Sequence, residues 1–322
     1  MGLSLDIQVD GASSAELGGR WRALTVVDGI DYQADSATLS LTVPPALEIE
    51  IPPLGAELRF AADGQSLGGP LHATAIRGDN RAGSVTVEAG ALHPRTTLRE
   101  ERIASWSGQS IAQIATAIAQ RAGLVPAISA TLGSKVPAGA IQSDESDMMF
   151  LRRLVARWSG RVVHKDGRLA VLPADETKSA SGAPLPPVEI DLRATGAWVR
   201  WRRSETAIVD IVQATHLEED GATPARLTLG DLPQGRRPQR RKLPGVFASV
   251  DDAGAAIRRV LASARSGFDY IEIGTSLLPA ARALYPVELS GVPKGFPTRL
   301  TIHQVRHELG RRVATTTVTA RP

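Results

Sequence analysis

Two histidines near the end of the sequence have a spacing that can hold a metal ion. His303 and His307 are separated by three residues, and on a helix this would bring both imidazoles to one ion. The residues around them read as a strand, where two positions four apart share a face at a distance of about 13 Å. We therefore interpret both as ordinary polar strand positions and predict no metal site.

Acidic residues gather before an apolar helical run in the middle of the chain. Asp144, Glu145 and Asp147 could form the carboxylate pair that glycoside hydrolysis uses. At a helix start, however, acidic groups cap the helix and favour its positive end. We therefore predict a capping role for them. A second acidic run, 218–221, is interpreted as a solvated hairpin tip rather than a cation site.

The one strong run of positive charge is GRRPQRRK, at residues 235–242. Such a run could contact nucleic acid phosphates or an acidic protein partner. It has prolines on both sides and no interleaved aromatic residue, so we predict a flexible surface loop. A role in protein docking stays open.

Motifs of the common enzyme classes are absent from the sequence. There is no GxSxG, Walker A, dinucleotide-binding fingerprint or HExxH. The chain has no cysteine, which excludes disulfides, a thiol nucleophile and cysteine-ligated zinc, and fits folding in the cytoplasm. We therefore name no catalytic, cofactor-binding or metal-binding residue and expect no cofactor.

Composition limits the remaining classes. The 322 residues can form two or three modest cores, and 37 basic against 34 acidic residues leave a net charge of only +3. This balance argues against specific nucleic-acid binding. The start alternates as a strand and contains Asp6 and Asp10, so we expect no signal peptide. No apolar stretch reaches the ~18 residues of a membrane span.

The elements that would position any site fall into three parts. The first, 1–95, alternates polar and apolar residues in short runs and is predicted to be β. Its predicted strands are 3–9, 21–27, 37–43, 57–61, 71–76 and 84–89, separated by turn residues that include Asp28-Gly29 and Asp63-Gly64.

The middle part, 96–180, changes to helical spacing. Helices are predicted at 110–121 and 146–159, followed by a hairpin at 161–172 that turns at Lys165-Asp166-Gly167. The proline-rich stretch 176–187 reads as a linker. This part is predicted to be a small α+β module.

The last part, 181–322, returns to strands. They are predicted at 196–203, 207–216, 225–229, 285–290, 298–305 and 313–320, with one helix at 250–266. Ser249, with Asp252 three residues on, has the pattern of a capping box for this helix.

A weak repeat suggests how the parts are related. Residues 58–89 and 287–320 each read as strand, glycine-rich turn, strand, polar turn and strand over nearly equal lengths. Such meanders also arise by chance, so duplication stays open. The predicted fold class is mainly β, with two β domains flanking an α+β module.

Two stretches of the chain have a distinctive sequence: TLREERIASWSGQSIAQIATAIAQRAGL (97–124) and IQSDESDMMFLRRLVARWSGRVVHKDGRLAVLP (141–173), with Gln142 to Leu154 the most distinctive run. Both resemble the phage late control gene D family, the hub proteins of contractile-tail baseplates. The segments LYPVELSG (284–291) and TIHQVRHELGRRVATTTVTA (301–320) are also similar, whereas the first 95 residues match in layout more than in residues.

The resemblance implies two tail-tube-like β-barrels per chain and a homotrimeric ring. Six barrels would then present near-six-fold symmetry to the tail tube and three-fold symmetry to the central spike. The implied partners are the tail spike protein, the tail tube or tube-initiator protein and other baseplate proteins. The implied location is the virion tail baseplate, with assembly in the host cytoplasm. The resemblance supplies no residue-level binding site.

Two other functions, and a second setting for a structural hub, stay open. A tail-associated cell-wall hydrolase would need an acidic pair or a metal site in a cleft, and the chain shows no added wall-digesting domain. A DNA-contacting tail component would use the basic run. The chain could also be the hub of a phage-derived contractile injection particle rather than of a phage.

Overall fold

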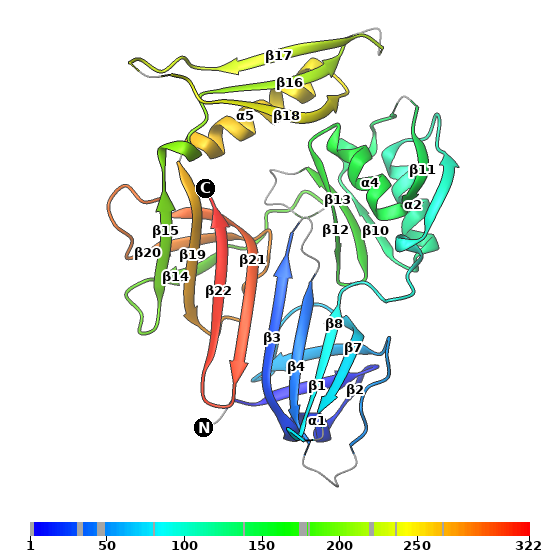
Figure 1. Ribbon diagram of the computed structural model, residues 1–322, viewed down its shortest axis with the longest axis vertical. Helices are drawn as coiled ribbons and strands as arrows, with labels where there is room; N and C mark the ends of the chain where they lie inside the picture. Colours follow the sequence, from blue (N-terminus) through cyan, green and yellow to red (C-terminus); the bar gives the residue numbers. More distant parts are fainter. Residues whose placement is uncertain are drawn as a thin grey trace.

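The computed structural model describes residues 3–30, 35–43, 49–79, 81–137, 139–173, 179, 181–218, 222–235, 237–265 and 267–322. The polypeptide forms two large β units, a mixed module and a small upper unit (Figure 1). Most of the described elements are strands in antiparallel pairs, so the prediction of a mainly β protein with an α+β insert is confirmed. No helix among these residues is long and apolar enough to cross a membrane.

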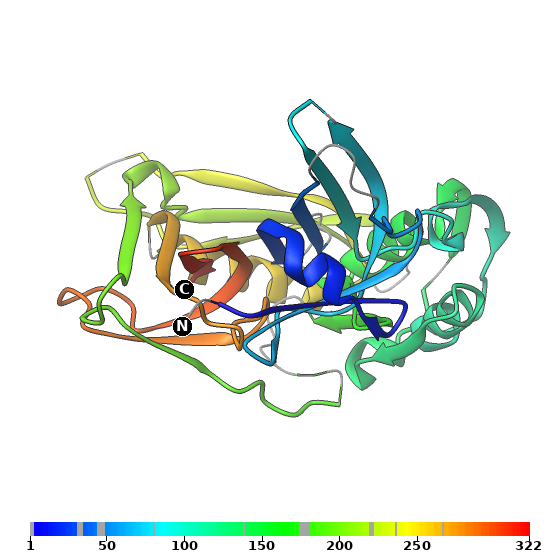
Figure 2. The same ribbon diagram turned by 90° about the horizontal axis from the view of Figure 1, so that it is seen from below.

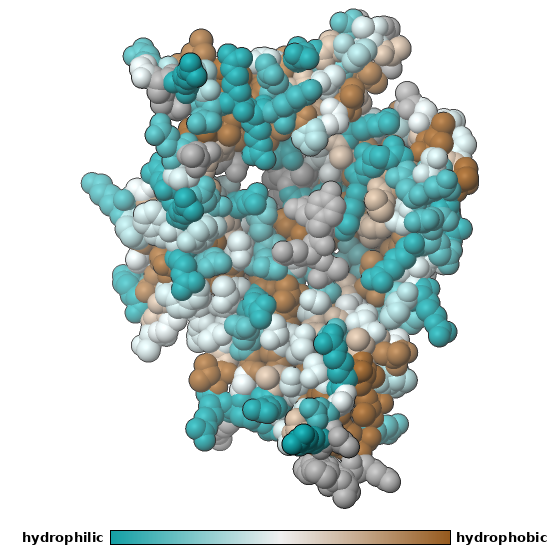
Figure 3. All heavy atoms as spheres, in the orientation of Figure 1, coloured by the Kyte–Doolittle hydropathy of each residue, from teal (hydrophilic) through white to brown (hydrophobic). Residues whose placement is uncertain are grey.

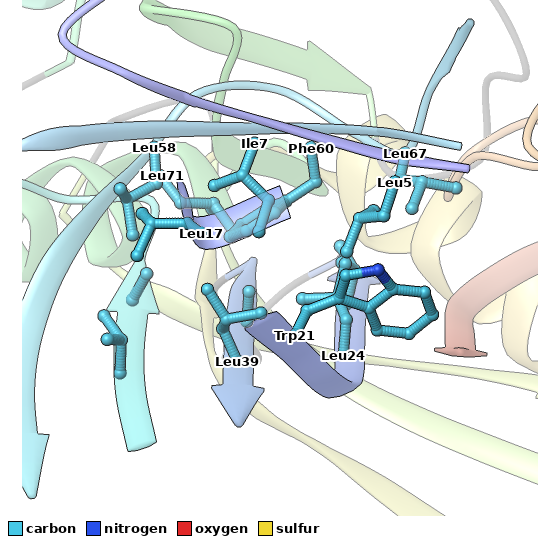
Figure 4. Close-up of a cluster of buried hydrophobic side chains, with 14 of the residues drawn as sticks. Leu5, Ile7, Leu17, Trp21, Leu24, Leu39, Leu58, Phe60, Leu67 and Leu71 are labelled. Carbon is cyan, nitrogen blue, oxygen red and sulfur yellow. The ribbon is translucent and has the colours of Figure 1, made fainter. Parts of the chain in front are cut away.

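The first β unit surrounds a single apolar core. Leu17 from the one helix of the unit meets Trp21, Leu39 and Leu58 from three different strands (Figure 4). The helix was not predicted; it lies at the lower end of the unit in Figure 1 and therefore faces the viewer in the view from below (Figure 2). The elements are β1 Leu5–Val9, β2 Ala12–Ser13, α1 Ala15–Arg20, β3 Trp21–Gly29, β4 Ser36–Thr42, β5 Glu57–Ala62, β6 Gln65–Ser66, β7 Leu71–Asp79 and β8 Ser84–Gly90.

The second β unit has its own core. Ile273, Val287, Ile302 and Val318 lie at its centre and are almost completely buried. Its strands are β14 Val188–Asp191, β15 Trp198–Arg203, β19 Phe268–Ser276, β20 Pro286–Ser290, β21 Arg299–Gly310 and β22 Ala314–Arg321. Of the strands predicted for this unit, β15, β20, β21 and β22 are confirmed; β14 and β19 were missed.

The two units share one continuous sheet. Strand β21 of the second unit pairs antiparallel with β3 of the first, from Gln304 opposite Gly29 to Gly310 opposite Ala23. These strands, far apart in sequence, lie side by side at the centre of the molecule (Figure 1). The main path runs β15-β19-β22-β21-β3-β4-β8-β7-β5-β1-β2 and, over the described residues, is open rather than a closed ring.

The two units repeat one strand order. In the first, the order across the sheet is β3-β4-β8-β7-β5-β1; in the second it is β15-β19-β22-β21-β20-β14. Numbered along the chain within each unit, with the two-residue strands β2 and β6 left out, both read 2-3-6-5-4-1. All corresponding pairs are antiparallel except the last, because β1 pairs antiparallel with β5 whereas β14 runs parallel to β20. The predicted repeats 58–89 and 287–320 fall on corresponding strands.

The mixed module lies between these units in the sequence. Its helices pack on a small sheet, with Ile114, Phe150 and Leu154 completely buried between them. The predicted hairpin is confirmed, with Asp166 and Gly167 at φ +50° and +69°, as a two-residue turn requires. The elements are η1 Thr97–Arg99, β9 Glu101–Ser105, α2 Ile111–Arg121, β10 Val125–Ile128, α3 Ala130–Gly133, β11 Ile141–Ser146, α4 Asp147–Ala156, β12 Gly160–Lys165 and β13 Arg168–Pro173.

The small upper unit is inserted between β15 and β19. After the short turn η2 Glu205–Ala207 it contains β16 Ile211–Leu217, β17 Pro224–Gly230, β18 Arg240–Phe247 and α5 Val250–Arg265. Helix α5 packs on the sheet through its own core, and hydrophilic side chains gather over the surface of this unit (Figure 3). Ser249 caps α5 as predicted, since its hydroxyl accepts from the Asp252 N–H at 3.2 Å.

Two sequence interpretations need correction here. Arg240, Arg241 and Lys242 begin β18, which pairs parallel with β16, so the last three of the eight residues of the basic run form a strand and not a flexible loop. Asp28-Gly29 is the end of β3 and not a turn. Residues 219–221 of the acidic run 218–221 and part of the predicted linker, 176–178 and 180, lie outside the described residues.

Candidate functional site

The two histidines lie in a strand, as predicted, but they are not equivalent. His307 on β21 is completely buried, so the interpretation of both as ordinary polar positions is wrong for this residue. Its Nδ1 lies 2.9 Å from the Thr316 hydroxyl, which also accepts from the Leu278 N–H at 2.8 Å. Within the described ranges, no cluster of three or more His, Asp or Glu residues could hold a metal ion.

The environment of His307 keeps its imidazole neutral. Burial is the main cause that lowers its pKa to about 4, and the charge of Arg282 acts in the same direction. A neutral imidazole can accept a hydrogen bond from Thr316 while the same hydroxyl accepts from Leu278. This chain of bonds joins β21 and β22 to the segment after β19, which is a structural task.

The acidic residues before α4 do not form a catalytic pair. Ser146, and not an aspartate, caps the helix by accepting from the Met149 N–H at 3.3 Å. Asp144 and Glu145 belong to strand β11, where the register shifts. Asp147 is in the first helical turn, as an acidic group there should be, but its side chain is fully enclosed. The capping interpretation is therefore wrong in detail.

The Asp147 carboxylate is neutralised inside the module. It lies 3.2 Å from Arg121 Nη1 and 3.6 Å from Arg102 Nε, and it accepts from Gln142 Nε2 at 2.9 Å. The Gln142 carbonyl in turn accepts from Trp106 Nε1 at 3.3 Å. The polar residues of the distinctive run 142–154 thus hold β9, β11, α2 and α4 together, since a buried charge is tolerated only when it is paired.

A second buried ionic group lies where three parts of the chain meet. The Lys165 ammonium, at the tip of the module hairpin, contacts the carboxylate of Asp28 on β3 and lies 3.5 Å from Asp35 Oδ1. The other oxygen of Asp28 accepts from the Ala283 N–H of the second β unit at 3.1 Å. Asp28, which is only 3% exposed, therefore connects all three parts. We call this group, with its neighbours Asp166 and Arg282, the junction.

Apolar and close-packed contacts surround the junction. Ile30, Leu172 and Leu284, one from each part, form a small shared core. A Cβ added to Gly69 of the first β unit would lie 2.2 Å from Asp166 Oδ1 and 3.3 Å from the Asp166 backbone nitrogen, so a larger residue there would displace the Asp166 side chain at the hairpin tip. Arg282 crosses between the β units and donates to the Ser66 carbonyl at 2.8 Å.

Burial changes the protonation of the junction. It lowers the pKa of Lys165 to about 7 and raises that of Asp35 to about 7, because it disfavours the charged form of each group. The charge of Asp166 acts in the opposite direction on the pKa of Lys165, since a neighbouring negative charge favours the protonated amine. The junction is thus tightly coupled and depends on all of its members.

Sequence reasoning missed the junction entirely. Lys165 and Asp166 were recognised only as turn residues, and Asp28 as part of another turn. The one available signal was a hairpin tip that carries adjacent opposite charges, and this does not identify a partner 137 residues away.

Strand β15 leaves an unusual edge exposed. Among the described residues of the chain it pairs only with β19, and Trp198 and Trp201 on it are 40% and 45% exposed. Large apolar side chains on an unpaired strand edge are typical of a surface that another chain covers. This arrangement favours assembly over chemistry.

Comparison with known proteins agrees with this arrangement. A family model described as the phage tail baseplate hub (GPD) matches residues 72–312. The chain belongs to this family. The resemblance seen in the sequence is therefore confirmed, and the family is one of structural baseplate hubs.

Two curated relatives are probable baseplate hub proteins of Escherichia phages. The chain is 31% identical to that of phage 186 over 169 residues, which cover 51% of this chain and 43% of the relative. It is 29% identical to that of phage P2 over 182 residues, covering 55% and 46%. The matched region thus spans less than half of the length of each relative.

Solved structures show that the fold is shared more widely. A tail protein from Neisseria meningitidis superimposes with a TM-score of 0.73 at 14% identity, covering 100% of this chain and 97% of that one. The 43 kDa tail protein of prophage MuSo2 from Shewanella oneidensis gives 0.73 at 12% identity, with 98% of each chain covered. An E. coli type VI secretion component, structurally similar to the T4 tail proteins gp27 and gp5, gives 0.62 at 13%, covering 98% and 76%.

Replacing Asp147 by alanine should destabilise the module. The substitution leaves Arg121 and Arg102 without their shared buried partner, and we expect a loss of about 3 kcal/mol in the free energy of unfolding. Chemical denaturation followed by tryptophan fluorescence measures it. Glu101→Ala, an exposed change on β9, is the control and should cost less than ~0.5 kcal/mol; equal effects of the two would contradict the network.

Replacing Lys165 by methionine should loosen the junction. The change keeps the side-chain length but leaves Asp28 buried without its cation, at an expected cost of about 3 kcal/mol. Adding Asp28→Asn should restore much of this loss, because the amide oxygen can still accept from Ala283. Thermal unfolding of both variants tests the coupling, with Lys294→Met on the exposed surface as control. Additive losses in the double variant would show that the two groups do not interact.

His307 should make the protein sensitive to acid. Its folded pKa of about 4 is below the ordinary value, so the unfolded chain binds the proton more tightly and stability falls as pH drops from 6.5 to 4. At pH 4 this histidine is expected to have lowered the free energy of unfolding by on the order of 3 kcal/mol. Denaturation across this range should show a flatter profile for His307→Gln than for the native chain. His303→Gln, which retains His307, should keep the steep profile.

Proposed function

We propose that this chain is a structural hub of a contractile-tail baseplate and that three copies form a ring. The observation that carries the proposal is the repeated strand order 2-3-6-5-4-1 in two units of one chain. Membership of the baseplate hub family supports it independently.

The repeated order gives a physical reason for such a ring. Two related units per chain would give a three-chain ring six similar positions, which match a six-fold tail tube. The rest of each chain, including the module and the upper unit, would keep the three-fold symmetry of a central spike. Closed rings of this kind use head-to-tail contacts between different surfaces of identical chains.

We infer partners and location from the same role. The partners would be the tail spike protein, the tail tube or tube-initiator protein and other baseplate proteins. The complex would assemble in the host cytoplasm and reside in the tail baseplate. We also propose the division 1–95, 96–180 and 181–322 for the first tube-like domain, the module and the second tube-like domain. A hub of a phage-derived injection particle would have the same architecture.

We further infer a structural rather than a catalytic role. In support of this inference, the carboxylate of Asp147 is enclosed by Arg121, Arg102 and Gln142, and neutral His307 is used in an internal hydrogen-bond chain. The small hollow of about 270 Å³ beside Trp21 is lined by Arg20, Arg22 and Arg311 without a carboxylate. These groups serve folding and packing.

The mass of the purified assembly tests the ring. We expect native mass spectrometry to find a species of three chains, either alone or after addition of the spike protein. Negative-stain images of that species should show a ring with near-six-fold appearance at one face. A chain that stays monomeric alone and with the spike would overturn the proposal.

A further inference from the structure

The strand pairing that joins the two β units within the chain has a counterpart, formed by two strands that are not paired with each other over the described residues. Strand β3 holds the second place along the chain in the first unit, as β15 does in the second; β7 and β21 both hold the fifth place. Inside the chain, β3 pairs with β21. Over the described residues, β15 and β7 are not paired with each other, and they lie on opposite sides of the molecule (Figure 1).

The correspondence between β7 and β21 holds at single residues. Each strand shows a register shift against its neighbour at the same point, just after Ala73 in β7 and just after Ile302 in β21. Ala73 N–H donates to the Ala56 carbonyl at 3.0 Å, and Ile302 N–H donates to the Tyr285 carbonyl at 3.0 Å. These matching bonds fix which residues of the two strands are equivalent.

The backbone beside these bonds repeats as well. The Ala73 carbonyl accepts from Gly55 and the Ile302 carbonyl accepts from Leu284, both at 2.8 Å. Gly55 and Leu284 have φ values of +91° and +77°, in the left-handed region that a leucine rarely occupies. The same turn therefore ends the pairing with β5 in one unit and with β20 in the other.

Beyond this point the edge of β21 is covered by another strand, whereas the equivalent edge of β7 is not covered by a strand among the described residues. After the register shift, residues 304–310 of β21 pair with β3. The equivalent residues of β7, which run to Asp79, pair with β8 along one edge, and along the other edge no strand pairs with them among the described residues. The pairing of β3 with β4 and of β15 with β19 makes Thr25 equivalent to Arg200 and Val26 equivalent to Trp201.

We propose that β15 of one chain pairs antiparallel with β7 of the next chain. This contact between chains repeats the pairing that β3 and β21 make within one chain. The proposal rests on the ring proposed above and identifies its contact surface. Transferring the internal register places Arg200 opposite Asp79, Trp201 opposite Gly78 and Arg202 opposite Arg77. Since the two edges are different surfaces, the contact is head-to-tail and can close into a ring.

The side chains at this register are compatible with pairing. Asp79 and Arg200 carry opposite charges, and Gly78 leaves space opposite the large ring of Trp201. Arg77 and Arg202 would stand opposite one another, but each already has an acidic partner on its own sheet: Glu88 at 2.8 Å and Asp269 at 3.1 Å. Pairing would also cover an exposed strand edge that otherwise invites aggregation.

Disulfide trapping in the full-length chain tests the register. The sequence contains no cysteine, so introduced thiols can react only with each other. We expect Asp79→Cys with Arg200→Cys to link chains under mild oxidation, giving a ladder that ends at three chains on a non-reducing gel. Gly78→Cys with Trp201→Cys is a second variant in the same register.

Two matched controls make the result interpretable. Thr25→Cys with Glu308→Cys is the equivalent pair between β3 and β21. It should form a disulfide within one chain, which does not link chains together. Asp79→Cys with Trp201→Cys is one residue out of register, where the side chains point to opposite faces of the sheet, and should link far fewer chains.

The outcomes separate this pairing from the ring itself. In-register linkage well above the out-of-register control supports the pairing. Three-chain species by native mass spectrometry without in-register linkage, while the internal pair does close, overturns the pairing and leaves the ring standing. A chain that is monomeric by mass and forms no linked species overturns both.

Discussion

The architecture depends on strand β21, which pairs with two different strands along one of its edges. The first residues of β21 pair with β20 of their own unit, and from Gln304 onward the strand pairs with β3 of the other unit. The register shift near Ile302 marks the change of partner. As a result Leu309 of the second unit is buried in the core of the first, and the two units cannot separate without breaking a ladder of backbone bonds. A bulge at this point is a means of redirecting a strand.

Buried charges orient the module on this shared sheet. An apolar contact alone would tolerate sliding, whereas the Lys165 ammonium must reach the Asp28 carboxylate and Asp28 must also receive the Ala283 N–H. Unpaired charges are costly in a low-dielectric interior, so few arrangements satisfy all three groups. The same logic inside the module places Asp147 among two arginines and a glutamine. Such paired charges hold the module in one orientation on the two β units.

Two Asp-Gly pairs illustrate where sequence reasoning succeeded and failed. Asp166-Gly167 was predicted to be a turn and is one, because both residues adopt positive φ between strands of matched length. Asp28-Gly29 has the same local chemistry but continues β3, since Asp28 is held by Lys165 and Ala283 and the Gly29 N–H donates to Asp35 at 3.1 Å. The basic run failed for a similar reason: pairing with β16 overrides the loop-like composition at Arg240 and Arg241.

By itself, the sequence determined most of the segments that form strands and helices, the cap at Ser249, the resemblance to baseplate hubs and the similar meanders at 58–89 and 287–320. These depend on periodicity, capping and turn residues, which act over a few neighbours in the chain. Only the tertiary structure decided that β3 meets β21, that Asp28, Asp147 and His307 are buried, and that two edges stay open. A period of two fixes which face of a strand is apolar but carries no information about which strand lies beside it. That choice is made by contacts between residues more than 200 positions apart.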